Sequence, residues 1–407
     1  MRQETLSDWR IVAGAAIALL VGNGPVMQFT FGIFLKPIEA EFGISRGFAS
    51  LILTMGLLAT ALALPFAGRI ADRVEPRLFS LLSILGFGSL LALIGLFADS
   101  VWLLGALVFM TGLVAAGHTP LPFVKLISMR FQKRRGLALA CCLTGIGIGA
   151  AILPIFLQAV VSQYGWKAGY GFLGVAVWVI AGTSVFLTIP KTSLERSDTA
   201  LAQQPHATER AYLRDRVFWL MVASLSLTAL CANGVIAHLI PMVSDRGVDA
   251  QSASRIIIWV GLATIMGRLV GGILLDRFWA PGVAVAFVAA MAAGLSIIIS
   301  GIDPSYYFIA AFIIGFGLGV EADLIGFLVS KYFPIEKFGE IFGALFGSFM
   351  LANSAGPLIL GIFFTWFGGY KFGLIVFTVL LAISCILFFM MGAYRYTSSK
   401  PAGQISH

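Results

Sequence analysis

The chain has 407 residues, of which 59% are hydrophobic and only 11% are charged, and its formal net charge is +8. A soluble domain carries about 25% charged residues, so a water-soluble surface cannot be built from this sequence. The composition excludes a cytosolic enzyme, a nucleic-acid-binding protein and a secreted disulfide-rich domain. It predicts an all-α protein that crosses a membrane many times.

Twelve runs are long and apolar enough to be membrane spans, since a helix needs about 20 apolar residues to cross a bilayer. The first run is too long for a signal peptide and predicts an uncleaved span. The longest polar stretch, 190–216, separates six runs from six and predicts a linker between an N-terminal bundle (1–189) and a C-terminal bundle (217–407). The predicted spans are 11–35, 47–68, 78–98, 101–126, 137–161, 168–189, 217–243, 253–274, 281–301, 305–329, 340–365 and 372–395.

The positive charges predict the orientation of these spans. With the N-terminus inside, 19 Lys and Arg residues fall in inner segments and five in outer segments. Cytoplasmic loops carry such an excess of positive charge. We therefore expect a multi-pass protein of the inner or plasma membrane with both termini cytoplasmic.

An internal repeat relates the two halves. A Gly-x-x-x-Asp-Arg motif ends the second span and recurs 204 residues later at the end of the eighth. Further matches fall at nearly the same offset, including Pro154 with Pro357 and Asn23 with Asn233. Repeated halves of this kind place a substrate site between them near the bilayer midplane. The sequence thus predicts twelve transmembrane helices in two pseudo-symmetric six-helix bundles.

The repeated motif resembles that of the major facilitator superfamily. The resemblance implies the major facilitator fold and a gate, in which the aspartate caps a neighbouring helix and the arginines bridge the halves. One departure is Glu75, where the family pattern has glycine. The gate residues implied by the resemblance are Gly68, Asp72, Arg73 and Arg77 after the second span, and Gly272, Asp276 and Arg277 after the eighth.

A narrower resemblance links the chain to the monocarboxylate and oxalate–formate carriers. It rests on segments 34–46 and 129–138, on Gly165-Trp166 and on Gly267-Arg268. The resemblance implies transport of small organic anions, with the arginine of span 8 holding the substrate carboxylate. Two departures concern coupling: Thr264 stands where monocarboxylate transporters have aspartate, and Phe29 where they have lysine. The predicted span 11 also lacks the lysine of the oxalate–formate carrier.

Charged residues within spans are the main site candidates, because each costs about 2.5–3.5 kcal/mol on insertion scales. Arg268 lies about 16 residues into span 8, roughly 24 Å along it, and its guanidinium suits a carboxylate. Glu321 and Asp323 lie at a similar depth in span 10. Two residues apart means about 200° apart on a helix, so only one of them faces the cavity. A carboxylate in a low-dielectric site takes up a proton readily, which makes both candidates for proton coupling. The alternative is a buried ion-pair network that only stabilises packing.

Other polar residues of the spans are candidates for substrate binding. His118 lies in span 4, the counterpart of span 10, and Lys125 follows on the same helix face. Gln28 and His238 occupy matching positions in spans 1 and 7, and Asn353 lies in span 11. For each of them, ordinary helix–helix hydrogen bonding or snorkelling to the interface is the alternative.

The sequence therefore predicts a secondary transporter that moves a small monocarboxylate, aliphatic or aromatic, by alternating access with proton symport. The alternatives are a drug or metabolite exporter of the same fold, driven by proton antiport, and a transporter-like receptor. No enzyme, cofactor or metal is expected, since the chain has no nucleophile–base set, no metal-spaced Cys/His set and no Walker-type phosphate loop. The expected partners are a small organic anion, protons and the lipid bilayer, without nucleic acid, and we expect a monomer.

Overall fold

The computed structural model describes residues 5–131, 135–190, 211–301, 303, 306–334 and 338–395. Those residues form helices and connecting turns, and no β-strand occurs among them. In chain order the helices are α1 (Leu6–Leu20), η1 (Gly24–Phe29), α2 (Phe31–Phe42), α3 (Arg46–Arg73), α4 (Pro76–Phe97), α5 (Val101–Ala115), η2 (Ala116–His118), α6 (Pro120–Arg130), α7 (Arg135–Ala176), η3 (Val177–Gly182), α8 (Thr183–Thr188), η4 (Ala211–Arg214), α9 (Arg216–Ser244), α10 (Ala250–Arg277), α11 (Ala280–Ile299), α12 (Tyr307–Leu318), α13 (Glu321–Tyr332), α14 (Phe338–Phe367) and α15 (Lys371–Phe389).

The described residues contain 11 segments long and apolar enough to cross a membrane. One of them, Leu137–Thr188, has 52 residues and holds the predicted spans 5 and 6. The two are joined at Gly165, whose φ of 83° is non-helical and is a backbone conformation that glycine adopts at little cost. The prediction of twelve spans is therefore confirmed.

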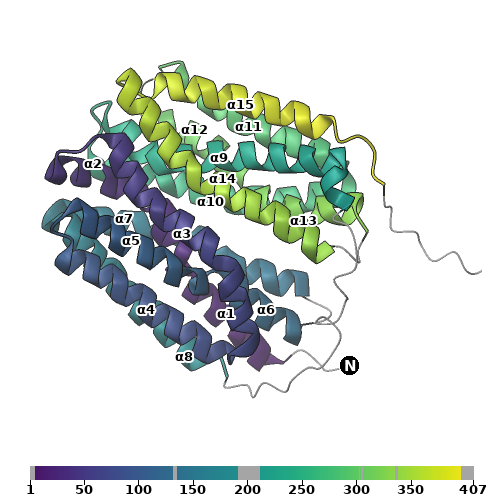
Figure 1. Cartoon of the computed structure of the whole chain (residues 1–407), viewed down its shortest axis with the longest axis horizontal. Coiled ribbons are helices and arrows are strands. Elements are labelled where there is room, and N and C mark those ends of the chain that lie inside the picture. Colours follow the sequence, from purple (N-terminus) through teal and green to yellow (C-terminus); the bar gives the residue numbers. More distant parts are fainter. Residues whose placement is uncertain are drawn as a thin grey trace, which may run out of the picture.

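The helices form two bundles (Figure 1). Helices α1 to α8 pack on one another through pairs such as α1 with α7 and α3 with α5. Helices α9 to α15 do the same through α9 with α14 and α10 with α12. The predicted fold of two six-helix bundles is confirmed, whereas most of the linker, 191–210, lies outside the described residues.

Three spans predicted as single helices are interrupted. Span 1 breaks between α1 and η1, span 4 breaks at η2, and span 10 breaks between α12 and α13. Pro25 and Pro120 each begin a new helical segment, because proline has no N–H to give to the preceding turn. The hydroxyl of Thr119 donates to the carbonyl of Ala116 at 3.0 Å, which satisfies a backbone group that the break leaves free. Apolar runs therefore located the spans but not their interruptions.

The two bundles meet along a seam that has two different ends. We call the end that holds Pro190 and Ala211 the linker face, and the opposite end, where α2 meets α3, the distal face (Figure 1). At the distal face the bundles touch closely: the Gly47 amide donates to Thr365 Oγ1 at 3.0 Å. A Cβ atom on Gly32 would lie only 2.6 Å from the carbonyl oxygen of Ala237.

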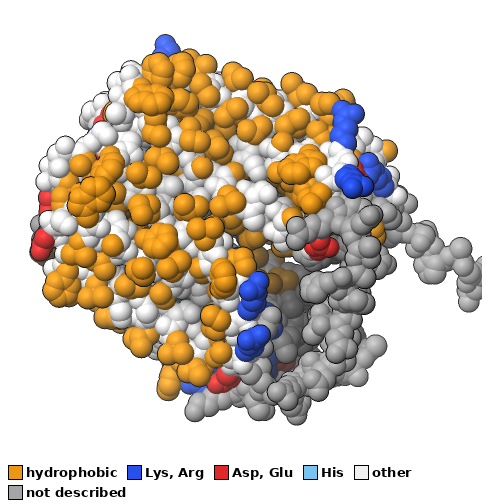
Figure 2. Space-filling model, in the orientation of Figure 1, with side chains coloured by type: hydrophobic (Ala, Val, Ile, Leu, Met, Phe, Trp, Pro, Cys, Tyr) orange, Lys and Arg blue, Asp and Glu red, His pale blue; other side chains and the backbone are white. Residues whose placement is uncertain are grey.

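Halfway along the seam α7 packs on α10. A Cβ atom on Gly261 would lie 2.8 Å from the Cβ of Ala151, and one on Gly147 would lie 2.6 Å from Ile265. Toward the linker face the bundles diverge, and the space-filling view shows a hollow between them at that end (Figure 2). The molecule is therefore closed at its distal face and open toward its linker face.

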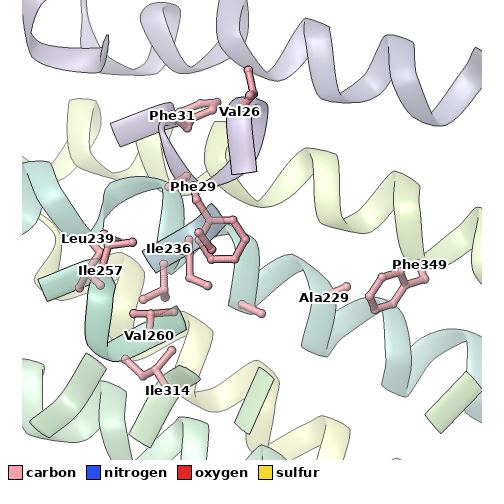
Figure 3. Close-up of a cluster of buried hydrophobic side chains, with 14 of the residues drawn as sticks. Val26, Phe29, Phe31, Ala229, Ile236, Leu239, Ile257, Val260, Ile314 and Phe349 are labelled. Atoms are coloured by element: carbon pink, nitrogen blue, oxygen red, sulfur yellow. The ribbon is translucent and has the colours of Figure 1, made fainter. Parts of the chain in front are cut away.

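An apolar cluster fills the seam on the distal side of this hollow (Figure 3). Phe29 of η1 points from the N-terminal bundle toward Ile236 of α9, with Ile257 and Val260 of α10 beside it. Phe29 is only 6% exposed. The position aligned with a lysine of the monocarboxylate transporters thus serves here as apolar packing between the bundles.

Candidate functional site

Arg268 lies on the face of α10 that meets the other bundle. Gly261 and Ile265 on this face contact α7, and Arg268 follows Ile265 by three residues, so it continues the same stripe. Helix α10 runs toward the linker face, and Arg268 lies one turn beyond the contact with α7. Its side chain is 28% exposed. The arginine therefore stands where the two bundles begin to separate.

Asp323 of α13 is the partner of this arginine. The Nε of Arg268 donates to Asp323 Oδ2 at 3.1 Å, and the carboxylate is 42% exposed. Within the described part of the chain, the terminal nitrogens of the Arg268 guanidinium make no hydrogen bond. Since a guanidinium has five donors, most of its capacity stays open to a ligand.

Glu321 points away from this pair, as its spacing from Asp323 predicts. It is the first residue of α13 and is 7% exposed. Its Oε1 has no hydrogen-bond partner among the described residues. Glu321 is thus enclosed inside the C-terminal bundle, while Asp323 faces the hollow.

Glycine at the break of span 10 holds the Arg268–Asp323 pair together. A Cβ atom on Gly319 would lie 2.5 Å from the amide nitrogen of Arg268 and 2.6 Å from the carbonyl oxygen of Thr264. The backbones of α10 and span 10 therefore touch at the arginine. Thr264 adds a hydrogen bond from its hydroxyl to the carbonyl of Gly315 at 3.2 Å.

The two candidates of span 4 do not lie at this site. His118 is fully buried within the N-terminal bundle, between the rings of Phe87 and Phe123. Neither of its ring nitrogens makes a hydrogen bond to a described residue. Lys125 donates to the carbonyl of Ala71 at 3.2 Å, so it caps the end of α3, where a cation is favourable.

The remaining binding candidates are spread along the seam and the bundles. Gln28 lies half-buried in η1. Asn353 is half-buried in α14, and its backbone carbonyl accepts a hydrogen bond from Asn233 at 2.7 Å. His238 is fully buried at the distal face, far along α9 from the linker face. In this conformation Arg268 and Asp323 come together, while His118, Lys125 and His238 bind other parts of the protein.

The sequence reasoning missed a second cluster, which we call the distal cluster: Lys36, Glu39, Arg46, His238, Asp245 and Tyr370. Arg46 had been counted only as an outer-loop charge, yet it is 8% exposed. It binds both oxygens of Glu39, at 2.6 and 3.1 Å, and Asp245 of the other bundle at 2.5 Å. It also donates to Tyr370 Oη at 3.0 Å and stacks over the ring of Phe364.

The carboxylate of Asp245 joins the two bundles at this cluster. Lys36 Nζ lies 2.6 Å from Asp245 Oδ1, opposite the contact with Arg46. Partial burial by itself raises the pKa of Asp245, but the hydrogen bonds from Arg46 and Lys36 outweigh it, so the pKa is lowered from its ordinary value. The sequence does place charged residues, Glu39 and Arg46, on both sides of the turn at Gly43. It could not show that a residue of the other bundle pairs with them.

None of the described side chains of the repeated motif makes a hydrogen bond or an ion pair between the bundles. Arg77 binds within its own bundle, donating to the carbonyl of Phe186 at 2.8 Å and lying over its ring. Gly68 is half-buried, and Arg73, Gly272, Asp276 and Arg277 are exposed. The side chain of Asp72 lies outside the described residues. The predicted role in the outward-open state thus stays a prediction.

Sequence comparison identifies the family of this fold. The profile of the major facilitator superfamily matches residues 17–357. The chain belongs to this superfamily. Family membership makes it a membrane transporter of small molecules and not an enzyme. Relatives that include monocarboxylate transporters confirm the resemblance to the monocarboxylate branch.

Three relatives show the range of transporters that this chain resembles. A gallate transporter of Pseudomonas putida is 23% identical over 377 residues, covering 81% of this chain and 83% of the relative. Mouse monocarboxylate transporter 11 is 25% identical over 312 residues, covering 73% and 66% of the two chains. The agnestins efflux protein AgnL12 of Paecilomyces divaricatus is 24% identical over 312 residues, covering 72% and 66%.

The arrangement of helices matches solved structures of the superfamily. A bacterial homologue of the human lysosomal transporter Spinster, in an inward-facing and occupied conformation, superposes with a TM-score of 0.73 at 17% sequence identity. The superposition covers 94% of this chain and 96% of that one. At this identity the likeness concerns the fold alone.

Proposed function

We propose that the protein carries a small organic monocarboxylate across the membrane, coupled to protons. The observation that supports this most directly is the pairing of Arg268 with a single exposed carboxylate, Asp323, at the point where the bundles separate. A guanidinium with open donors binds a carboxylate with two parallel hydrogen bonds. The relatives named for gallate, an aromatic monocarboxylate, and for monocarboxylates agree with this substrate class.

The membrane orientation follows from the excess of positive charge. The sequence assigns 19 Lys and Arg residues to the inner segments, and α3, α9 and α10 each have an inner end at the linker face, so we place this face in the cytoplasm together with both termini. The structure then corresponds to a transporter open to the cytoplasm, and the distal face is the outer face. We infer the inner or plasma membrane as its location and a monomer as the transporting unit, with halves 1–189 and 217–407.

The proposed cycle is an exchange of partners at Arg268. When Asp323 takes up a proton, its charge is lost and its hold on Arg268 weakens, so a substrate carboxylate replaces it on the guanidinium. When the substrate leaves, Asp323 releases the proton and pairs with Arg268 again. Glu321 is a second proton carrier in the proposal, since it is an enclosed carboxylate with an oxygen that lacks a described partner. The halves rock about this site.

The test measures ligand binding by thermal stability. A ligand of the folded state at about 100 times its Kd adds about 2.7 kcal/mol to stability. We expect benzoate or lactate, added to the purified protein, to raise the unfolding temperature of wild type and not of Arg268→Ala. The matched control is Arg255→Ala, which removes an exposed arginine from the distal end of the same helix. A full ligand response in Arg268→Ala would overturn the proposal.

A second variant tests whether transport is coupled to protons through Asp323. Asp323→Asn mimics the protonated carboxylate, so we expect it to bind the carboxylate with little dependence on pH and to lose accumulation against a gradient. Uptake in vesicles with and without a proton gradient measures both properties. Gradient-driven accumulation that persists in Asp323→Asn would move the coupling role to Glu321, and persistence in Glu321→Gln as well would contradict proton coupling at this site.

Export of a metabolite is the second candidate, supported by the relative named as an efflux protein. In that case Asp323 is the counter-charge for a cationic compound, or the Arg268–Asp323 pair forms a neutral lining for an uncharged one. Competition separates the two functions. A lipophilic cation that displaces the bound carboxylate, or binds when no carboxylate does, favours export.

A further inference from the structure

A chain of hydrogen bonds crosses the distal cluster, and Ser50 Oγ of α3 also lies 3.4 Å from His238 Nε2. Arg46 donates to Tyr370 Oη at 3.0 Å, and Tyr370 Oη lies 3.0 Å from His238 Nδ1. His238 Nε2 lies 2.8 Å from the carbonyl oxygen of Pro357. Three helices of two bundles, α3, α9 and α14, are thereby tied to one imidazole ring.

The donors and acceptors of this chain match the neutral form of His238, in which every group of the chain has a partner. Arginine only donates, so the Tyr370 oxygen accepts from Arg46 and directs its own proton at His238 Nδ1. A carbonyl only accepts, so His238 Nε2 carries the hydrogen that points at Pro357. The histidine in the closed distal face is therefore neutral, with its proton on Nε2.

The charges around His238 balance without it. Arg46 of α3 and Lys36 of α2 are paired with Glu39 of α2 and Asp245, the residue after α9. From α14 and the start of α15 the ring is faced by uncharged groups, the Pro357 carbonyl and the Tyr370 hydroxyl. Two positive and two negative side chains thus form a neutral set, in which His238 itself is 0% exposed.

A second proton on His238 disrupts this arrangement in two ways. It makes the Tyr370 oxygen accept from both Arg46 and His238 Nδ1, so the tyrosine must turn its own proton away from the ring and lose that hydrogen bond. It also adds an unbalanced positive charge close to Arg46 in an enclosed site, which is costly. Neither cost exists once the bundles part and water reaches the ring.

We propose that His238 is a proton-binding gate residue: the distal face closes only when His238 is neutral, and a proton on His238 holds it open. Since the ring is sealed in the closed state, it exchanges its proton only while the distal face is open. This role does not depend on which substrate Arg268 takes. A low pH on the distal side therefore favours the conformation that is open to the distal side.

Proton linkage sets the expected size of the effect. A proton that binds only the open form changes the ratio of open to closed molecules by up to about tenfold for each pH unit below the pKa of the open-state histidine. An accessible histidine titrates between about pH 8 and pH 5. The pKa of Asp245 is lowered by its hydrogen bonds from Arg46 and Lys36, so Asp245 does not produce a change in this range.

Distances between spin labels on the two bundles measure the opening. Trp102 at the start of α5 is 77% exposed, and Ser300 at the end of α11 is exposed, and both lie at the distal face. Trp102→Cys and Ser300→Cys, in a protein whose four native cysteines are replaced by alanine, carry the labels. We expect the population with the long distance to grow several-fold between about pH 8 and pH 5, without any substrate.

His238→Gln decides the proposal, because glutamine keeps the hydrogen bond to Pro357 but does not titrate. We expect its long-distance population to stay constant over this pH range. The matched control is His118→Gln, which removes the other fully buried histidine of a span, away from the seam, and should respond as wild type does. A wild type without a pH response, or a His238→Gln variant that responds like wild type, would overturn the proposal.

Tyr370→Phe provides a second variant if His238→Gln fails to fold. It removes the donor to Nδ1 and the link to Arg46, so the open population should rise even at pH 8 and depend less steeply on pH. An unchanged population and an unchanged slope would contradict the role of the chain. The labels report the distal gate without substrate, so this result is independent of the ligand response of Arg268.

Discussion

Arg46 and Arg268 are both arginines at the seam between the bundles, yet their surroundings differ. Arg46 is 8% exposed and its guanidinium is shared by Glu39, Asp245 and Tyr370, with a ring stacked on it. Arg268 has one described hydrogen-bond partner, through Nε alone. An arginine with most of its donors used holds a structure, whereas one with most of its donors open can bind a ligand.

The same contrast separates the two ends of the molecule. The distal face joins the bundles by ion pairs and close backbone contacts, and the linker face is hollow beside a half-exposed ion pair (Figure 2). In a transporter that alternates between two states, the distal contacts must break for the other state to form. In the proposed cycle, Arg46 makes a contact that exists in one state only, whereas Arg268 belongs to a site that is used in both states.

Removing Arg46 should have the largest effect on stability. Arg46→Ala leaves Glu39 and Asp245 without their shared cation, and the loss of one partner of a buried ion pair costs about 3–5 kcal/mol. Thermal unfolding of the purified protein measures the loss. Lys36→Ala is the control, because it removes a 38% exposed partner of the same Asp245, and an exposed pair contributes less than about 1 kcal/mol. Equal losses in the two variants would contradict the comparison.

A change at Gly319 should weaken the open site without touching the arginine itself. Gly319→Ala places a Cβ 2.5 Å from the Arg268 amide, so α10 and span 10 must move apart at a cost of about 1–3 kcal/mol. We expect weaker carboxylate binding in the thermal-shift assay. Gly343→Ala is the matched control, since its Cβ would meet open space. Normal binding in Gly319→Ala would show that this close approach does not position Arg268.

A low pH should weaken the contacts of the distal cluster, with a smaller effect than the substitutions of Arg46 and Gly319. The pKa of Asp245 is lowered in the folded protein, so its contribution to stability is fully present above the unfolded value of about 4 and is lost as the pH falls further. The spin-label distances should therefore lengthen a second time below about pH 4. Asp245→Asn should lack this second step while keeping the response of His238 at higher pH, and a step retained in Asp245→Asn would assign it to another carboxylate.

Much of the fold was predictable because membrane spans are a one-dimensional signal. Apolar runs of fixed length located the twelve spans, and the internal repeat gave the two bundles. The interruptions in spans 1, 4 and 10 escaped this reasoning, since apolar composition does not report where a helix breaks, as at the extended backbone of Thr119 before Pro120. The spacing of Glu321 and Asp323 correctly predicted opposite directions, but not which one meets Arg268.

The sequence by itself determined the class of the protein, its spans, its charge bias and a short list of polar residues within the spans, because each of these depends on residues close together in the chain. Only the tertiary structure decided their partners: Arg268 meets Asp323 across 55 positions and Arg46 meets Asp245 across 199. The structure also shows that His118 lies inside the N-terminal bundle and that His238 lies in the distal cluster. The reason is that a side chain's environment in a helical bundle is set by the neighbouring helices, and helix packing is not encoded in hydropathy or spacing alone.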